Sequence, residues 1–307
     1  MAGAVRSLER EEQTMRIELK RGEYTAAVDT RGGELVSFRD GQGVEYIWQG
    51  DAKSWTGQNP NLFPIVGNLR DGTVRINGKD CEMARHGFAR RSEFTVEEQG
   101  EDYVVMELRH SPETLACYPC PFVLQVCHQL LDHGFSTRFE VRNPGGEDLL
   151  FCVGAHTGIN CPLNAGERFE DYRLVFDEKE EVRPLIPTER GLLAAGRFGP
   201  ELENGDTIRL DHRVFDQVDT LIFEGLRSSG VTLGRTDGGR SVHMTFDGFP
   251  MIAFWTMPHA GAPYICLEPW HGCAAYEDES GDFIDKPHAV RLAPGGEKRL
   301  IYTVELR

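Results

Sequence analysis

Four short segments place titratable side chains among apolar or glycine-rich neighbours. They are NPNLFPIVGNLRDG (59–72), ARHGFARR (84–91), VGAHTGINCPL (153–163) and YICLEPWHG (264–272). Together they supply a carboxylate, two histidines, an arginine and aromatic rings, with no evident nucleophile, phosphate loop or metal motif. Such a set of groups suits proton transfer on a neutral, hydroxyl-rich ligand.

Glu268 stands in an apolar, strand-like run, directly before a proline and a tryptophan. Two interpretations are open. The carboxylate either faces solvent from an alternating strand, or it is held in a pocket where it handles a proton. Its position alone does not choose between them.

The histidines of these segments each have two interpretations. His156 follows the apolar run FCVGA, and it is either a core histidine satisfied by backbone carbonyls or a proton donor. His86 lies between Arg85 and Gly87, where a loop packed under the fold would explain it equally well. The remaining histidines show no metal-ligand spacing, so we expect no metal site.

An arginine and two tryptophans complete the candidates. Arg70 precedes Asp71-Gly72, and it is either a turn residue paired to a carboxylate or a fork of donors for ligand hydroxyls. Trp255 and Trp270 are either core aromatics or flat surfaces for the C–H face of a sugar ring.

Strands must position these side chains, because alternating apolar and polar residues dominate the chain after Met15. Turns at Asp132-His133-Gly134 and Asp237-Gly238-Gly239 predict two hairpins. Only SPETLACY (111–118) is predicted to be helical, with Ser111 as N-cap and Pro112 at the first helical position.

Many short antiparallel strands without a linker or internal repeat predict an all-β fold. We expect a large antiparallel β-sandwich, formed as one domain by residues 15–307. Its concave outer face would gather a site from segments far apart in the sequence.

Composition excludes several classes of protein. The chain is 40% hydrophobic and 27% charged and has no long apolar run, which excludes a disordered chain and a membrane span. A formal net charge of -16 without a Lys/Arg stripe argues against nucleic acid as a partner. A neutral or cationic small ligand fits this charge better than a nucleic acid does.

Residues 1–14 are charged where the core of a signal peptide would be apolar, so we expect a frayed leader on a cytoplasmic protein. The eight scattered cysteines predict free buried thiols. Cys117 and Cys120 have redox spacing, but a strand-like run follows them instead of a helix, which argues against a redox motif.

In order and approximate spacing, the four segments resemble the aldose 1-epimerase (mutarotase) family, most closely its LacX-like branch. YIWQGDAKSW (46–55) and DTLIF (219–223) also fit, and the resemblance runs from about Met15 to the C-terminus. It implies a galactose mutarotase-like supersandwich, an isomerase that interconverts α and β anomers of an aldose without a cofactor.

The resemblance also assigns roles. In the family a glutamate removes the proton of the C1 hydroxyl while a histidine protonates the ring oxygen; the ring opens, rotates about C1–C2 and recloses. The glutamate matches Glu268 and the histidine matches His156. The sugar-binding histidine, arginine and aspartate match His86, Arg70 and Asp219.

Ordinary pKa values suit these roles, because a glutamate near ~4.3 is ionised at neutral pH and a histidine near ~6.5 can donate a proton. In a shared pocket we expect the charge of Glu268 to favour protonated His156. The chain departs from the family motif GGHPAFNCPL at Ala155, Thr157 and Gly158-Ile159, changes that we expect to alter packing at His156 and hence substrate choice.

Three functions stay open. The first is an epimerase of a free aldose, and the second is a carbohydrate-binding or sensing protein of the same fold. Arg85, Arg90 and Arg91 also leave room for a sugar-phosphate 1-epimerase. In each case the partner is a small-molecule sugar, and both a monomer and a homodimer are compatible with the sequence.

Overall fold

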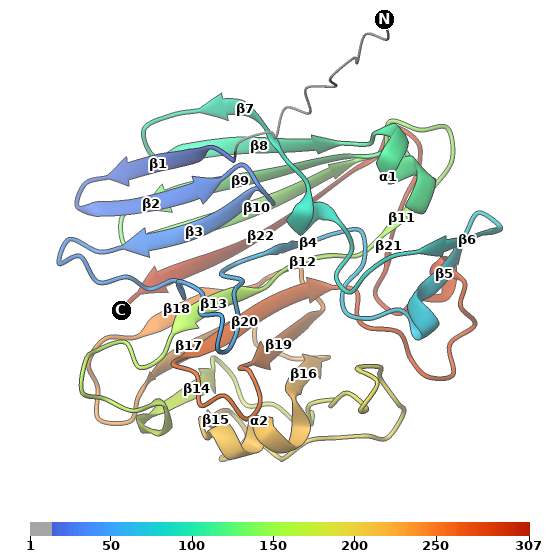
Figure 1. Ribbon diagram of the computed structural model, residues 1–307. Coiled ribbons are helices and arrows are strands. Elements are labelled where there is room, and N and C mark those ends of the chain that lie inside the picture. Colours follow the sequence, from blue (N-terminus) through green and yellow to red (C-terminus); the bar gives the residue numbers. More distant parts are fainter. Residues whose placement is uncertain (1–13) are drawn as a thin grey trace, which may run out of the picture.

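The computed structural model describes residues 14–307 and consists mainly of strands that pair antiparallel (Figure 1). The predicted all-β sandwich is confirmed. All but the last residue of the predicted leader lies outside the described residues. Within the described part of the chain, no helix is long and apolar enough to cross a membrane.

The largest sheet has nine strands. In spatial order they are β15 (Thr207–Arg209), β14 (Tyr172–Phe176), β17 (Gly230–Arg235), β18 (Val242–Thr245), β22 (Glu297–Leu306), β10 (Gly134–Arg142), β9 (Val123–Leu131), β8 (Tyr103–Arg109) and β7 (Thr95–Gln99).

A six-stranded sheet carries the candidate site. Its order is β16 (Thr220–Glu224), β19 (Met251–Trp255), β20 (Tyr264–His271), β12 (Val153–Ala155) and β4 (Asn61–Leu62), while β13 (Thr157–Asn160) also pairs with β20.

Smaller sheets complete the fold. They are β1 (Arg16–Arg21), β2 (Tyr24–Asp29) and β3 (Glu34–Arg39); β11 (Leu149–Phe151) with β21 (Val290–Leu292); and β5 (Thr73–Ile76) with β6 (Lys79–Glu82).

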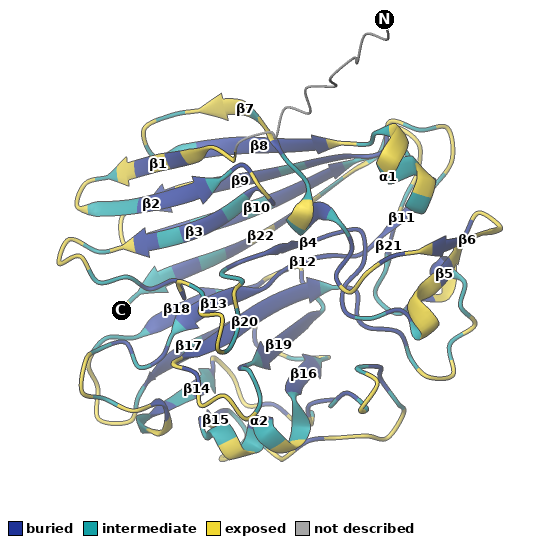
Figure 2. Cartoon of the chain, in the orientation of Figure 1, coloured by how far each residue is buried: buried dark blue, intermediate teal, exposed yellow. Residues whose placement is uncertain are grey.

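The two large sheets pack face to face through alternating apolar side chains. Phe176 of β14 lies 5.2 Å from Phe223 of β16 and 5.9 Å from Phe254 of β19, measured between ring centroids. Figure 2 shows the strands of the six-stranded sheet buried along almost their whole length. Because one face of this sheet meets the core, its other face is free to build a site within the protein.

Both predicted hairpins are present, as β9–β10 and β17–β18. The predicted helix is α1 (Pro112–Cys117), and the hydroxyl of Ser111 accepts a hydrogen bond from the backbone N–H of Thr114 at 3.3 Å. The prediction that no other segment is helical was wrong. A second helix, α2 (His212–Val218), is capped by Asp211 and buries only Phe215, which is too little for a periodic apolar pattern to show.

All eight cysteines are free thiols and seven are buried, as the sequence predicts. Cys117 ends helix α1, so CYPC does not open a helix as a redox motif does.

Candidate active site

A cavity of about 240 Å³ lies on the face of the six-stranded sheet that is turned away from the nine-stranded sheet. Strands β16, β19 and β20 form its floor, and loops from distant parts of the chain form its walls. Its lining consists of Trp55, Gly67, Arg85, His86, Arg90, His156, Pro187, Gly191, Leu193, Thr220, Ile222, Trp255, Met257, Glu268, Trp270 and Ala274.

Glu268 lies in the middle of this floor. Successive side chains of a strand point to opposite faces, so Cys266, Glu268 and Trp270 of β20 share one face. The Glu268 side chain is only 1% exposed. The solvent-facing interpretation of this carboxylate is therefore wrong.

Pro269 does not end the regular strand pairing, although a proline cannot donate a hydrogen bond to a neighbouring strand. Strand β20 continues to His271, and Pro269 stays in register with Ile252 of β19. The missing N–H is accommodated on the other side of the strand, where pairing changes from β13 to β12.

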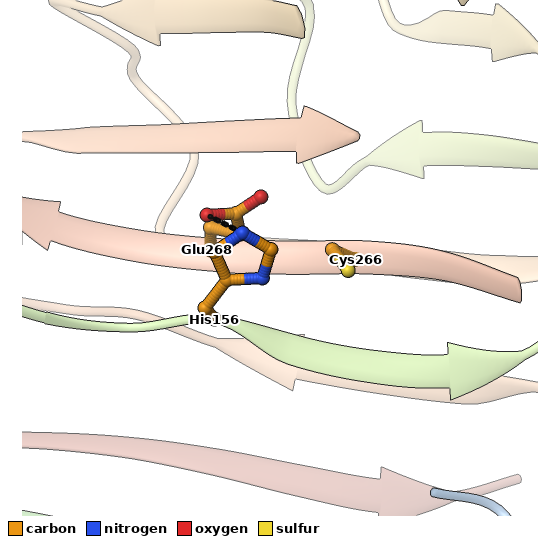
Figure 3. Close-up of side chains that lie close together, drawn as sticks. All are labelled: His156, Cys266 and Glu268. Atoms are coloured by element: carbon orange, nitrogen blue, oxygen red, sulfur yellow. Dashed lines mark ion pairs between the residues drawn. The ribbon is translucent and has the colours of Figure 1, made fainter. Parts of the chain in front are cut away.

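His156 is held directly opposite Glu268. It separates β12 from β13, and both strands pair with β20 in one continuous register: Gly154 faces Trp270 and Thr157 faces Leu267. Residues opposite each other in an antiparallel pair have their Cβ atoms about 5 Å apart on the same face. The Nε2 of His156 accordingly lies 3.3 Å from Oε2 of Glu268 (Figure 3).

Burial sets the charge of this pair. It raises the pKa of Glu268 well above its usual range, against the opposing effect of the Arg85 charge. It also lowers the pKa of His156 to about 3, and the Arg85 charge adds to this effect. We expected the Glu268 charge to favour protonated His156, but desolvation of both groups outweighs it. Both shifts favour the uncharged forms, a carboxyl group beside a neutral imidazole.

His86 is fixed as a neutral hydrogen-bond donor. The backbone N–H of Gly67 donates to its Nδ1 at 3.1 Å, which leaves the ring proton on Nε2. Burial holds the pKa of His86 well below its usual value. The next residue must be glycine, since at a φ of 72° a Cβ on Gly87 would lie 2.3 Å from the carbonyl oxygen of Phe63.

Indole rings pack around His156. The ring of Trp55 lies 4.8 Å from it at a tilt of 33°, and Trp255 meets it edge-on at 5.5 Å. Nε1 of Trp255 donates to Oδ1 of Asp219 at 2.8 Å. Asp219 thus orients Trp255, and it lines a neighbouring cleft of about 400 Å³ instead of the cavity itself.

The two candidate arginines have different positions. Arg70 is not part of the cavity lining, and its Nη1 donates to the carbonyl oxygen of Glu277 at 3.2 Å. Arg85 lines both the cavity and the neighbouring cleft. Within residues 14–307, Arg85 forms no ion pair, and the buried Nε of Arg90 has no hydrogen-bond partner.

Comparison with known proteins identifies the family of this chain. The family described as aldose 1-epimerase matches residues 15–303. The chromosomal protein LacX of Lactococcus lactis subsp. lactis is 36% identical over 299 residues, which cover 95% of this chain and 99% of that protein. The chain belongs to the aldose 1-epimerase family.

Solved structures of similar proteins identify the fold. A galactose mutarotase related enzyme from Lactobacillus acidophilus superposes with a TM-score of 0.89 at 28% identity, covering 95% of this chain and 97% of that one. A galactose mutarotase-like protein from Lactobacillus casei gives 0.87 at 27% identity, covering 95% and 100%. The fold is therefore galactose mutarotase-like.

The residues of strand β13 that depart from the family motif lie on both faces of that strand. Thr157 points away from the cavity, and its hydroxyl donates to Oδ1 of the buried Asn59 at 2.8 Å. Gly158, where the motif has alanine, matters more to the site. A Cβ there would lie 2.9 Å from Cζ3 of Trp55, so the glycine lets that ring approach His156.

Sequence reasoning missed two residues of the cavity lining and a third residue beside it. Trp55 was noted only within a stretch that fits the family, and Arg85 only as a possible phosphate ligand. Cys266 was counted among the scattered thiols. Its spacing of two from Glu268 in an apolar run was the available indication that both face the same way.

Proposed function

We propose that this member of the family is an aldose 1-epimerase that interconverts the anomers of a free aldose. One observation carries the proposal: Glu268 and His156 face each other at 3.3 Å on the floor of a cavity of about 240 Å³. The cavity is smaller than the roughly 300–1,000 Å³ of pockets for drug-sized ligands, which suits a single sugar ring.

The reaction needs a base at the C1 hydroxyl and an acid at the ring oxygen. Glu268 accepts the hydroxyl proton and His156 donates a proton to the ring oxygen while the bond between C1 and that oxygen breaks. The product is the open-chain aldehyde. After rotation about C1–C2, the same transfers run in reverse and close the ring on the other face of the carbonyl.

The pair can run this cycle with a single proton. Burial favours that proton on Glu268, and its transfer to Nε2 of His156 across the 3.3 Å contact leaves Glu268 able to accept and His156 able to donate. No net proton has to enter or leave the cavity during a turnover. The Nε2–H of His86 and the two indoles of Trp55 and Trp255 then hold and align the sugar.

A sugar phosphate is the second candidate substrate. Arg85 and Arg90 line the cavity, and Arg85 continues into the cleft of about 400 Å³ beside it. Guanidinium groups without a carboxylate partner are suitable ligands for a phosphate. A substrate panel therefore has to contain both free and phosphorylated aldoses.

Polarimetry of freshly dissolved sugars tests the activity. We expect the wild-type protein to speed the relaxation of α-glucose, α-galactose or another sugar of the panel above the buffer rate. Glu268→Gln and His156→Asn should each lower kcat by about 10²–10⁴-fold, because each removes one proton transfer. Glu201→Gln, which changes an exposed carboxylate outside the cavity, should keep full activity.

Three outcomes separate the alternatives. Sugar binding in calorimetry without faster relaxation of any sugar would identify a binding protein instead of an enzyme. Acceleration of phosphorylated sugars only, with an increased KM in Arg85→Ala, would identify a sugar-phosphate epimerase. Full activity of Glu268→Gln would refute the assigned mechanism while leaving the activity in place.

A further inference from the structure

Three side chains with different metal-binding atoms meet beside the cavity, which two of them, His156 and Glu268, also line. They are His156, Cys266 and Glu268, and their ligand atoms all lie within 4.8 Å of one another (Figure 3). Cys266 has no part in the proposed epimerase reaction. Its thiol is at this place because it shares a face of β20 with Glu268, two residues away.

Two polar atoms of this cluster are buried without a hydrogen bond in the described part of the chain. Nδ1 of His156 has no partner, and Oε2 of Glu268 has only the 3.3 Å contact with Nε2 of His156. Both residues are more than nine-tenths buried, at 8% and 1% exposure. Buried polar atoms are ordinarily satisfied by a partner, so these atoms are available to a ligand that enters the cavity.

We infer that this cluster is a binding site for a divalent zinc-like cation, which blocks the proposed active site when it binds. Nitrogen, thiolate sulfur and carboxylate oxygen together form a donor set typical of Zn²⁺. Mg²⁺ and Ca²⁺ prefer oxygen ligands only, and a site containing a thiol and an imidazole discriminates against them.

The geometry requires only a small adjustment. Zinc bonds of about 2.0–2.3 Å in a tetrahedron place neighbouring ligand atoms about 3.3–3.8 Å apart. The contact between His156 and Glu268 is already 3.3 Å. The widest separation in the cluster, at most 4.8 Å, closes by about 1 Å through side-chain rotation alone. A water molecule completes the coordination at the fourth position.

Binding and catalysis are then mutually exclusive. The metal takes lone pairs of both Glu268 and His156, so the carboxyl proton of Glu268 and the thiol proton of Cys266 both leave to the buffer as the metal–ligand bonds form. With both groups occupied, neither can exchange a proton with the substrate. The cation therefore acts as a reversible inhibitor that competes with the sugar.

Direct metal binding tests this inference without relying on catalysis. Isothermal titration of the full-length wild-type protein with ZnSO₄ should give one site, and MgCl₂ should give no heat of binding. Cys266→Ala should weaken zinc binding at least 10-fold, whereas Cys120→Ala, which removes a buried thiol outside this cluster, should not. Co²⁺ should produce a thiolate-to-cobalt charge-transfer band that is absent in Cys266→Ala.

Activity provides a second readout if the epimerase proposal holds. Zinc should raise the apparent KM for the sugar in the wild type, and EDTA should reverse the effect. Cys266→Ala should keep its basal rate within about twofold and need at least 10-fold more zinc for the same inhibition. Circular dichroism and thermal unfolding check its fold, and Cys266→Ser provides a variant with nearly the same volume.

Equal zinc affinity of folded wild type and folded Cys266→Ala would overturn the inference, and so would the absence of a thiolate band with Co²⁺. An inactive wild type that binds zinc through Cys266 would support the metal site and refute only the proposed function. An active enzyme that does not bind zinc would support the proposed function and refute the metal site.

Discussion

Gly158 controls how closely Trp55 approaches His156. A Cβ at this position would lie 2.9 Å from both the indole and the carbonyl oxygen of Gln58. We expect Gly158→Ala to displace the ring, lower stability by about 1–3 kcal/mol and reduce kcat/KM by about 10–10²-fold through sugar misalignment. Gly146→Ala has no atom within 4 Å of its new Cβ and serves as the matched control. Steady-state polarimetry measures the change in kcat/KM, and tryptophan fluorescence measures the change in stability. An unchanged KM would show that Trp55 does not hold the sugar.

A single site residue could be predicted where it stands in a recognisable sequence motif. It could not be predicted where only the fold brings it close to the other site residues. Glu268 and His156 came from separate motifs, and the fold makes them cross-strand neighbours. Arg70 stands in its expected motif, but its guanidinium contacts Glu277 and does not reach the cavity. The cavity is lined by Arg85 instead. A sequence gives the order of such loops but not the direction of each long side chain.

His128 makes the β9–β10 hairpin sensitive to acid. Its buried ring contacts the hydroxyl of Thr137 through Nδ1 at 2.9 Å and the carbonyl oxygen of Gly33 through Nε2 at 2.8 Å. Burial lowers the pKa of His128 from 6.5 to about 4. Because the folded pKa lies below the unfolded one, this stabilising contribution is present above pH ~6.5 and is lost as the pH falls towards ~4.

Urea unfolding at two pH values measures this effect. Between about pH 7 and pH 4.5, wild type should lose about 2–3 kcal/mol more unfolding free energy than His128→Gln, whose amide can still donate to Gly33. His133→Gln changes an exposed histidine at the turn of the same hairpin and should follow wild type. Parallel losses in all three proteins would contradict the role of His128.

Elements with a repeating pattern were predicted well, and elements defined by a few contacts were not. The long hairpin strands β9 and β10 have nine residues each, and every second residue of β10 from Phe135 to Val141 is buried. Helix α2 has seven residues, one of them buried, and offers no such pattern. Strand β20 shows a third case, because a proline that argues against a central strand is tolerated where its neighbour changes from β13 to β12.

At the scale of the whole molecule, alternation in the sequence predicted strands and a sandwich, but it did not say which strands meet. Strand β14 shares a sheet with β17 and β15, yet its Phe176 packs against Phe223 and Phe254 of the other sheet. These contacts join segments up to 78 residues apart. The proposed active site depends on them, since β19 presents Phe254 to the core and Trp255, the next residue, to the cavity.

Removing one of these core rings should therefore weaken the whole fold. Phe254 is fully buried, and its ring contacts both sheets at 5.9 Å. We expect Phe254→Ala to lower the free energy of unfolding by about 3–5 kcal/mol, because the strands cannot collapse into the space left by the ring. Ile301→Ala, which shortens a side chain 49% exposed on β22, should cost about 1 kcal/mol or less. Urea unfolding of both variants measures the difference. Equal losses of unfolding free energy would mean that packing between the two sheets does not supply the stability on which the position of the site depends.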